Sequence, residues 1–244
     1  MRSITLALAL LLALSAGAYA QPAANGEVAY THPAVNVGVS AGVLLGSLTE
    51  TVDDDEALSS GALGYYIAGG AALAELPIAI SASYATFSPD KIKVSGGAET
   101  DDEHTASALD LLVGYRVHEN IAVAAGWASA SYSDVTKGPI ESPSAESRSA
   151  SGLAIGAMGG THLGNGIALS GKAYFVPSAT IEIDDNKHDE NGSLFGLSAS
   201  IGYQFMPNLG AEAGYRLSRA SFEEGGDTVA FTASGFFAGV TFTF

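Results

Sequence analysis

Apolar residues alternate with small or polar residues along most of the chain. In the stretch 193–205, one parity reads Phe, Leu, Ala, Ile, Tyr and Phe, whereas the other reads Leu, Gly, Ser, Ser, Gly and Gln. A period of two predicts a β-strand with one apolar face and one small or polar face. Ten such segments follow one another, at approximately 34–46, 61–74, 78–88, 106–117, 121–133, 150–163, 167–176, 193–205, 209–221 and 229–244.

The length of these segments separates two kinds of β protein. Most contain 10–14 residues, whereas strands in soluble proteins usually have about 5–6. A tilted strand that crosses a bilayer takes about 9–11 residues. A secreted β-sandwich would also alternate, but with shorter strands. The segment lengths therefore favour membrane-crossing strands.

The connections alternate between short and long. Turns of three residues lie at 75–77, 118–120, 164–166 and 206–208, and longer polar loops lie at 48–60, 89–105, 134–149, 181–192 and 223–228. Transmembrane barrels have short periplasmic turns and long extracellular loops. The pattern predicts an all-β, antiparallel up-and-down transmembrane β-barrel over residues 34–244. It has about ten strands, or eight if two weak hairpins belong to loops.

Charge is concentrated in the long loops. They hold 21 of the 26 acidic residues and five of the ten basic ones. This balance argues against nucleic-acid binding, which needs a basic surface, and it places most of the negative charge at the outer mouth of the barrel. Cysteine is absent, which excludes disulfides and thiolate chemistry. A β-sandwich gives no reason to confine acidic residues to one set of loops.

The two ends of the chain carry export and insertion signals. Residues 1–20 combine a short basic start, an apolar run at 4–14 and the small-x-small motif Ala18-Tyr19-Ala20, as secretory signal peptides do. Residues 21–33 are then expected to be a periplasmic segment. At the other end, apolar residues occupy every second position of the last segment, including Phe236, Val240, Phe242 and Phe244.

That last segment resembles the C-terminal insertion signal of bacterial outer-membrane β-barrel proteins, which the barrel-assembly machinery reads. Together with the alternating loops, the architecture resembles small barrels of the OmpA, OmpW and opacity-protein type over the whole exported chain. The resemblance implies the outer membrane of a Gram-negative bacterium, with lipid and lipopolysaccharide as neighbours. It selects no subfamily and implies no cofactor.

Charged residues stand out on the inward parity, which otherwise consists mostly of Gly, Ala and Ser. We interpret six of them as a lumen network: Asp110, Arg116, His162, Lys172, Glu212 and Arg216. Counted from the periplasmic turns, Asp110 lies level with Arg216, and Lys172 lies level with Glu212. Because an unpaired charge in a lumen is costly to desolvate, we expect opposite charges to meet there.

This lumen allows two functions. Ion pairs and water could close a narrow barrel, or breaking a pair could open a small pore that favours cations because its mouth is acidic. The sequence predicts an integral structural protein or small porin-like pore. The alternative is a closed barrel that displays its loops for surface recognition or adhesion.

Metal binding and catalysis have weaker support. The runs Asp53-Asp54-Asp55-Glu56 and Asp184-Asp185 offer oxygen ligands that could hold divalent cations weakly. The runs 101–104 and 184–189 each place a His beside carboxylates, an arrangement that could activate water in a hydrolase. Because runs of charge are usually solvated surface, we expect the protein not to be an enzyme.

Overall fold

The computed structural model describes residues 35–53, 55–73, 76–89, 92–94, 99–100, 103–136, 144–183, 186–224 and 227–244. The expected signal peptide and periplasmic segment lie outside these residues. Ten long strands form the barrel: β1 (Val35–Val52), β2 (Asp55–Leu73), β3 (Ile78–Pro89), β6 (Glu103–His118), β7 (Ile121–Thr136), β8 (Ser144–Gly164), β9 (Ile167–Ile183), β10 (Asn186–Met206), β11 (Leu209–Glu224) and β12 (Asp227–Thr243).

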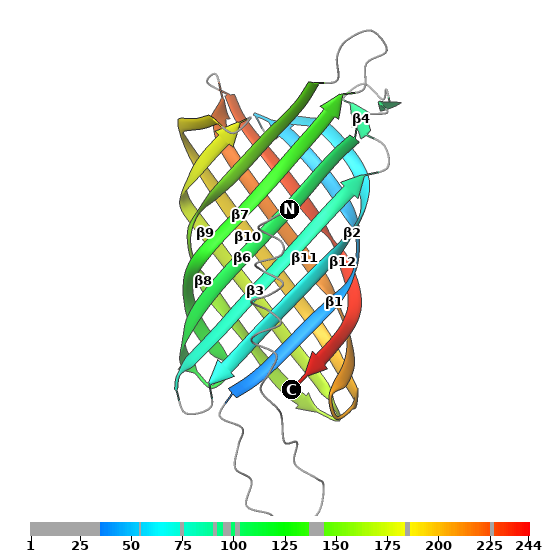
Figure 1. The fold of residues 1–244 in the computed structure, drawn as a ribbon, viewed down its shortest axis with the longest axis vertical. Helices are drawn as coiled ribbons and strands as arrows, with labels where there is room; N and C mark the ends of the chain where they lie inside the picture. Colours follow the sequence, from blue (N-terminus) through cyan, green and yellow to red (C-terminus); the bar gives the residue numbers. More distant parts are fainter. Residues whose placement is uncertain are drawn as a thin grey trace, which may run out of the picture.

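Every barrel strand pairs antiparallel with its neighbours in sequence order, and β1 pairs with β12 to close the sheet. The closing register runs from Gly38 opposite Thr243 to Val52 opposite Val229. Two short strands, β4 (Ile92–Val94) and β5 (Glu99–Thr100), extend from β2 at one end, at the top of Figure 1. The predicted closed barrel of ten strands, rather than eight, is confirmed.

The strands are longer than their periodicity predicts, and the additional length lies at the outer end. For example, β1 and β2 continue to Val52 and from Asp55, through a region expected to be a loop at 48–60. Likewise, β9 ends at Ile183 and β10 begins at Asn186. The prediction of long outer loops at these positions is wrong. The strands stay paired as hairpins beyond the residues at which apolar and polar positions alternate.

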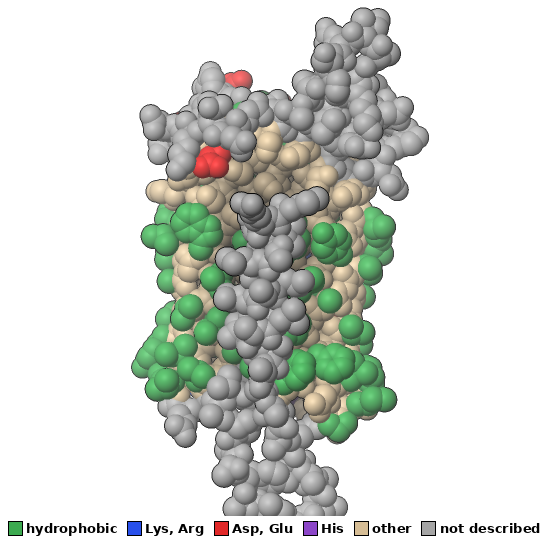
Figure 2. Space-filling model, viewed as in Figure 1, with side chains coloured by type: hydrophobic (Ala, Val, Ile, Leu, Met, Phe, Trp, Pro, Cys, Tyr) green, Lys and Arg blue, Asp and Glu red, His purple; other side chains and the backbone are tan. Residues whose placement is uncertain are grey.

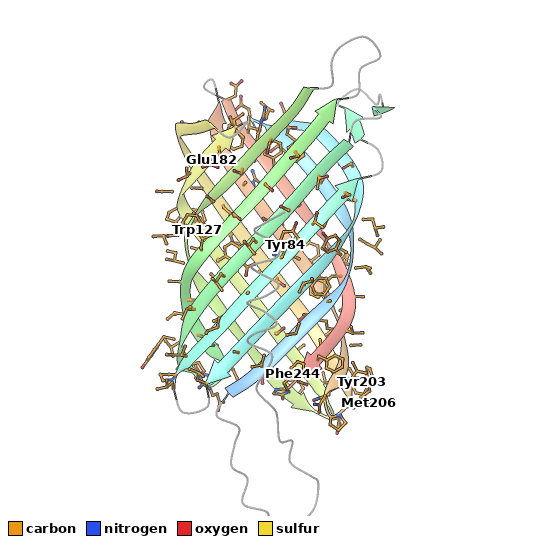
Figure 3. All side chains as sticks on the ribbon, viewed as in Figure 1. Tyr84, Trp127, Glu182, Tyr203, Met206 and Phe244 are labelled. Carbon is orange, nitrogen blue, oxygen red and sulfur yellow. The ribbon has the colours of Figure 1, made fainter. Side chains whose placement is uncertain are left out.

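Large apolar side chains cover the outside of the barrel. Exposed members include Val43 and Leu45 on β1, Val113 and Tyr115 on β6, and Leu153 on β8, and Figure 2 shows such side chains along both edges of the barrel wall. Tyr203, Met206 and Phe244 lie at the lower, periplasmic end, while Glu182 lies near the outer end (Figure 3). The exterior is therefore suited to lipid along its flank and to water above. None of the described segments is a helix of the length and hydropathy needed to cross a membrane.

The interior differs between its two halves. Towards the outer end, the inward positions carry a continuous cluster of buried apolar side chains, among them Leu44, Leu48, Phe87, Leu112, Tyr132, Val176, Ile181, Leu194, Phe222 and Phe231. Towards the periplasmic end, they are mostly Gly, Ala and Ser around open space. The predicted small-residue lining is therefore right for the periplasmic half and wrong for the outer half.

Candidate functional site in the barrel lumen

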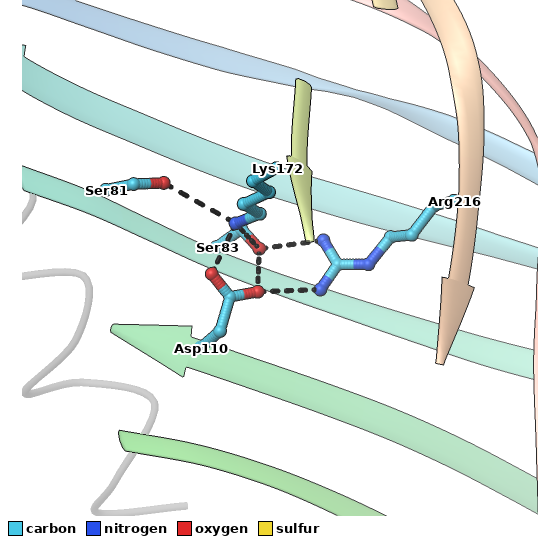
Figure 4. Close-up of polar contacts among 5 residues, drawn as sticks. All are labelled: Ser81, Ser83, Asp110, Lys172 and Arg216. Carbon is cyan, nitrogen blue, oxygen red and sulfur yellow. Dashed lines mark hydrogen bonds and ion pairs between the residues drawn. The ribbon is translucent and has the colours of Figure 1, made fainter. Parts of the chain in front are cut away.

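A cluster of charged side chains crosses the lumen between these halves (Figure 4). Asp110 on β6 accepts hydrogen bonds from Lys172 on β9, through Oδ1, and from Arg216 on β11, through Oδ2 at 3.2 Å. The Asp110 side chain is 0% exposed, and those of Lys172 and Arg216 are 12% and 7% exposed. One carboxylate therefore holds two cations in the middle of the barrel.

Ser83 on β3 completes the cluster. It lies directly opposite Asp110 in the β3–β6 ladder, and its hydroxyl donates to Asp110 Oδ2 at 2.6 Å. Ser83 Oγ in turn accepts hydrogen bonds from Lys172 Nζ at 2.9 Å and from Arg216 Nη1 at 2.8 Å. Such shared hydrogen bonds are what allows these charges to be buried, because they replace part of the lost hydration.

Strand register explains why the two cations meet. Lys172 and Arg216 both lie opposite Ser198 of the intervening strand β10. Three neighbouring strands therefore present Lys, Ser and Arg at one level, and the small Ser leaves room for the longer side chains. The opposite wall supplies Ser83 and Asp110 at one level of β3 and β6.

Glu212 belongs to a second contact. Tyr66 on β2 donates its hydroxyl hydrogen to Glu212 Oε1 at 2.6 Å, and its ring packs against Phe237 with centroids 4.6 Å apart. The expected Lys172–Glu212 pair is therefore corrected, since Lys172 bonds to Asp110. Counting along strands misplaced the partner because the register across β9–β11 sets Lys172 level with Ser198 and Arg216, whereas Glu212 lies opposite Gly202.

Arg116 and His162 lie away from the Asp110 cluster. Arg116 Nη2 donates to the backbone carbonyl oxygens of Leu73 and, at 2.7 Å, Leu76, so it fastens the β2–β3 connection at the periplasmic end. His162 is exposed and lines the cavity near that end. Neither belongs to the ion cluster, contrary to the expected network.

Aromatic rings close the lumen on the outer side of the cluster. Phe231 stacks on Tyr132 with ring centroids 4.6 Å apart and on Phe222 at 5.8 Å. The Arg148 guanidinium lies 5.6 Å above the Phe231 ring and 3.9 Å from Glu50. The lumen therefore has a polar layer at mid-height and a mainly aromatic and aliphatic layer beyond it.

Two adjoining cavities, of about 400 and 390 Å³, occupy the periplasmic side. The first reaches Lys172 and Arg216, and the second reaches Gly166 and Gln204 at the periplasmic turns. Their linings share Ser40, Gly69, Gly70, Ser170, Ser200 and Glu212. We call the two together the periplasmic vestibule.

Known structures share this architecture. The outer-membrane protease OmpT from Escherichia coli superposes with a TM-score of 0.54 at 15% identity, over 89% of this chain and 99% of that one. The translocator domain of the autotransporter NalP from Neisseria meningitidis gives 0.45 at 12% identity, over 88% and 90%. The attachment invasion locus protein Ail of Yersinia pestis gives 0.41 at 12%, over 86% and 99%. No protein-family model and no curated protein sequence matches the chain.

The protein has the fold of a small outer-membrane β-barrel. Its closed sheet leaves no unpaired edge along the flank, which a lipid environment requires, and its exterior is apolar. These properties make it a protein of the Gram-negative outer membrane, in contact with lipid.

In this outer-membrane barrel, the expected insertion-signal residues lie on the closing strand. Phe236 is 71% exposed, Val240 and Phe242 are also exposed, and the Phe242 and Phe244 rings stack with centroids 5.9 Å apart. The apolar parity of β12 thus faces outward where lipid or an insertion partner can contact it. Recognition of this strand by the barrel-assembly machinery stays a prediction.

The candidate metal ligands that the structure describes, Asp53 and Asp55, lie at the outer end of the barrel. Asp53 takes a φ of 49°, and its Oδ1 accepts a hydrogen bond from the Thr228 amide at 2.9 Å, so it joins the β1–β2 turn to β12. Asp55 is exposed, whereas Asp54, Asp184, Asp185 and the Glu56 side chain lie outside what the structure describes. Among the described side chains, no group of three or more His, Cys, Asp or Glu could hold a metal.

Two residues of the lumen site were missed from sequence. Ser83 read as part of the small inward lining, although its place opposite Asp110 makes it the centre of the cluster. Tyr66 lies on the inward parity beside the outward Tyr65. A bulky polar ring on an otherwise small-residue parity was the signal for Tyr66, whereas no sequence signal distinguished Ser83 from other serines.

Proposed function

We propose that this outer-membrane barrel is closed and non-conducting, and that it acts through the acidic hairpins at its outer end. One observation carries the proposal: two consecutive layers obstruct the lumen. The polar layer holds Asp110 at 0% exposure, and the apolar layer beyond it contains residues such as Leu44, Val176 and Leu194, which are also fully buried. An ion would have to displace both layers.

The alternative is a small cation-favouring pore. It has the support of the vestibule and of the acidic outer end, but it requires the ion pairs to separate and the aromatic rings to move. Narrow barrels are just filled by side chains at about eight strands, and open aqueous channels occur at about 16. Ten strands favour closure.

Single-channel recording in a planar bilayer tests closure. We expect the refolded mature protein to stay silent, with a heat-dependent shift in gel migration as the control for folding. A matched pair of variants probes the layers. Phe231→Ala removes a ring from the aromatic layer inside the lumen, whereas Phe236→Ala removes a ring from the lipid-facing side of the same strand. Reproducible cation-selective steps from the wild type would refute the proposal.

The outer end supplies the surface for recognition. The described residues there include exposed carboxylates, Asp55, Glu223 and Asp227, and the five predicted loop regions together contain 21 acidic and five basic residues. Such a surface attracts a partner with positive charge, and salt weakens that attraction over about 8–10 Å.

A binding test follows from this charge. Vesicles that carry the protein should bind an immobilised oligolysine peptide, and added salt should weaken the binding. The triple change Asp55→Asn, Glu223→Gln and Asp227→Asn should also weaken it, whereas Glu212→Gln in the lumen should not. Equal binding by all three proteins would remove the outer carboxylates from the proposal.

No catalysis is part of this proposal. The likeness to a protease at 15% identity concerns the fold. The side chains of the runs 101–104 and 184–189 lie outside what the structure describes.

A further inference from the structure

The periplasmic vestibule has the size of a ligand site. Its two cavities, of about 400 and 390 Å³, fall in the range of roughly 300–1,000 Å³ for small-molecule pockets. Small inward residues keep it open: at Gly202, for example, a Cβ would meet no atom closer than the Ala211 carbonyl oxygen at 3.7 Å. The volume by itself does not identify a ligand, so the proposal depends on the polar groups that line the cavities.

The first cavity of the vestibule is lined by groups with unused hydrogen-bond donors. A guanidinium has five N–H donors, and Arg216 uses two of them, towards Ser83 and Asp110. Its side chain is only 7% exposed, yet it lines the first cavity. Arg116, in the same lining, has a buried Nε without a hydrogen-bond partner. Both guanidinium groups therefore have N–H donors that no described protein atom accepts.

The vestibule wall also has an acceptor to spare. Glu212 lines both cavities, and Tyr66 occupies its Oε1. Its other carboxylate oxygen has no hydrogen bond within the described residues. Hydroxyl groups of Ser198 and Ser200 lie along the same wall. One side of the vestibule therefore offers a cationic donor and an anionic acceptor separated by neutral hydroxyls.

We propose that the vestibule binds a small zwitterionic solute from the periplasm, with its carboxylate on Arg216 and its ammonium group on Glu212. A simple anion would be repelled by Glu212, and a simple cation by Lys172 and Arg216. Arg216 and Glu212 are four residues apart on β11, or about 13 Å along the strand. This backbone spacing favours a short peptide, whose terminal charges are far apart, over a single amino acid. This site is independent of whether the barrel conducts.

Titration calorimetry on the refolded barrel in micelles tests the proposal with trialanine as the probe. We expect binding with a Kd of about 1 mM or tighter. Blocking either terminus, by acetylation or amidation, should weaken binding by about tenfold or more. Glu212→Gln should weaken the binding of trialanine by a similar factor. It should leave the affinity for the acetylated peptide unchanged, because that peptide has no ammonium group.

A matched pair of bulky substitutions locates the site. Gly202→Phe fills the second cavity, which reaches the periplasmic turns, and should abolish trialanine binding. Ile201→Phe places the same ring on the lipid-facing side of β10, where Ile201 is exposed, and should leave binding intact. The heat-dependent gel shift shows that each variant is folded. A folded wild type that binds no trialanine, equal affinity for blocked and free peptides, or binding that survives Gly202→Phe would each overturn the proposal.

Discussion

Replacing Asp110 by Asn should destabilise the barrel more than any other single change in the ion cluster. The side chain is fully buried, and its carboxylate forms ion pairs with both Lys172 and Arg216. Neutralising it leaves two cations close together without an anion in their cluster. Removing one partner of a buried ion pair typically costs about 3–5 kcal/mol, and the second stranded cation places Asp110→Asn at the upper end of that range.

A double-mutant cycle separates this electrostatic effect from lost packing. Lys172→Met alone leaves a one-to-one pair of Asp110 with Arg216, and it should cost about 1.5–3 kcal/mol, the worth of hydrogen bonds to a charged group. Combined with Asp110→Asn, it removes one of the stranded cations. The double variant should therefore be more stable than the sum of the single effects predicts, by at least about 1 kcal/mol.

Urea unfolding from lipid vesicles measures these free energies. Trp127 is the single tryptophan and lies exposed on the lipid-facing wall (Figure 3), so its fluorescence reports transfer from lipid to water. Asp227→Asn makes the same chemical change at an exposed outer position and should stay within about 0.5 kcal/mol of wild type. If Asp110→Asn also stayed within that margin, or if the two changes were strictly additive, the shared-carboxylate account would be wrong.

Three further substitutions test the structure elsewhere. Phe231→Ala should cost about 3–5 kcal/mol because it empties the stacked aromatic layer, whereas Phe236→Ala on the lipid face of the same strand should cost less; urea unfolding compares them. Gly126→Ala should prevent formation of the heat-shifted gel band, because a Cβ there would lie 1.9 Å from a backbone carbonyl oxygen of β6. Gly61→Ala should fold normally, because its Cβ would meet nothing within 4 Å. Arg116→Met removes two hydrogen bonds to carbonyl oxygens of the β2–β3 connection and should speed amide exchange at the periplasmic start of β3 by about tenfold, as expected for a loss near 1.4 kcal/mol.

The barrel could be predicted from the sequence because lipid imposes period two on the outer face. Where the wall leaves the lipid, that constraint ends, and the prediction failed there. Glu50 and Thr51, for example, lie opposite Phe231 and Ala230 in the β1–β12 ladder, although the predicted strand stopped before them. Backbone pairing continues without apolar alternation because water, rather than lipid, surrounds the extended hairpins.

The charged residues of the lumen could be recognised, and the Asp110–Arg216 pair was predicted correctly, but the partner of Lys172 was not. Asp110, Lys172 and Arg216 were visible as charges on the inward parity. Which of them meet depends on the tilt and shear of the closed sheet, which set relative heights across the lumen. The long side chains add further freedom, because Tyr66 reaches Glu212 from another strand. Three-dimensional register therefore supplied what strand-by-strand counting could not.

The order of the layers makes the lumen asymmetric. Lys172 and Arg216 border the vestibule, so water from the periplasmic side can approach the cations, while Asp110 behind them stays fully buried. From the outside, any ion must first pass the stacked rings of Tyr132, Phe222 and Phe231, and the Arg148 guanidinium above the Phe231 ring repels cations there. The same ion cluster can therefore border an open cavity on one side and support a closed wall on the other. Periplasmic binding and outer-surface recognition are compatible in this barrel because neither requires passage between the two sides.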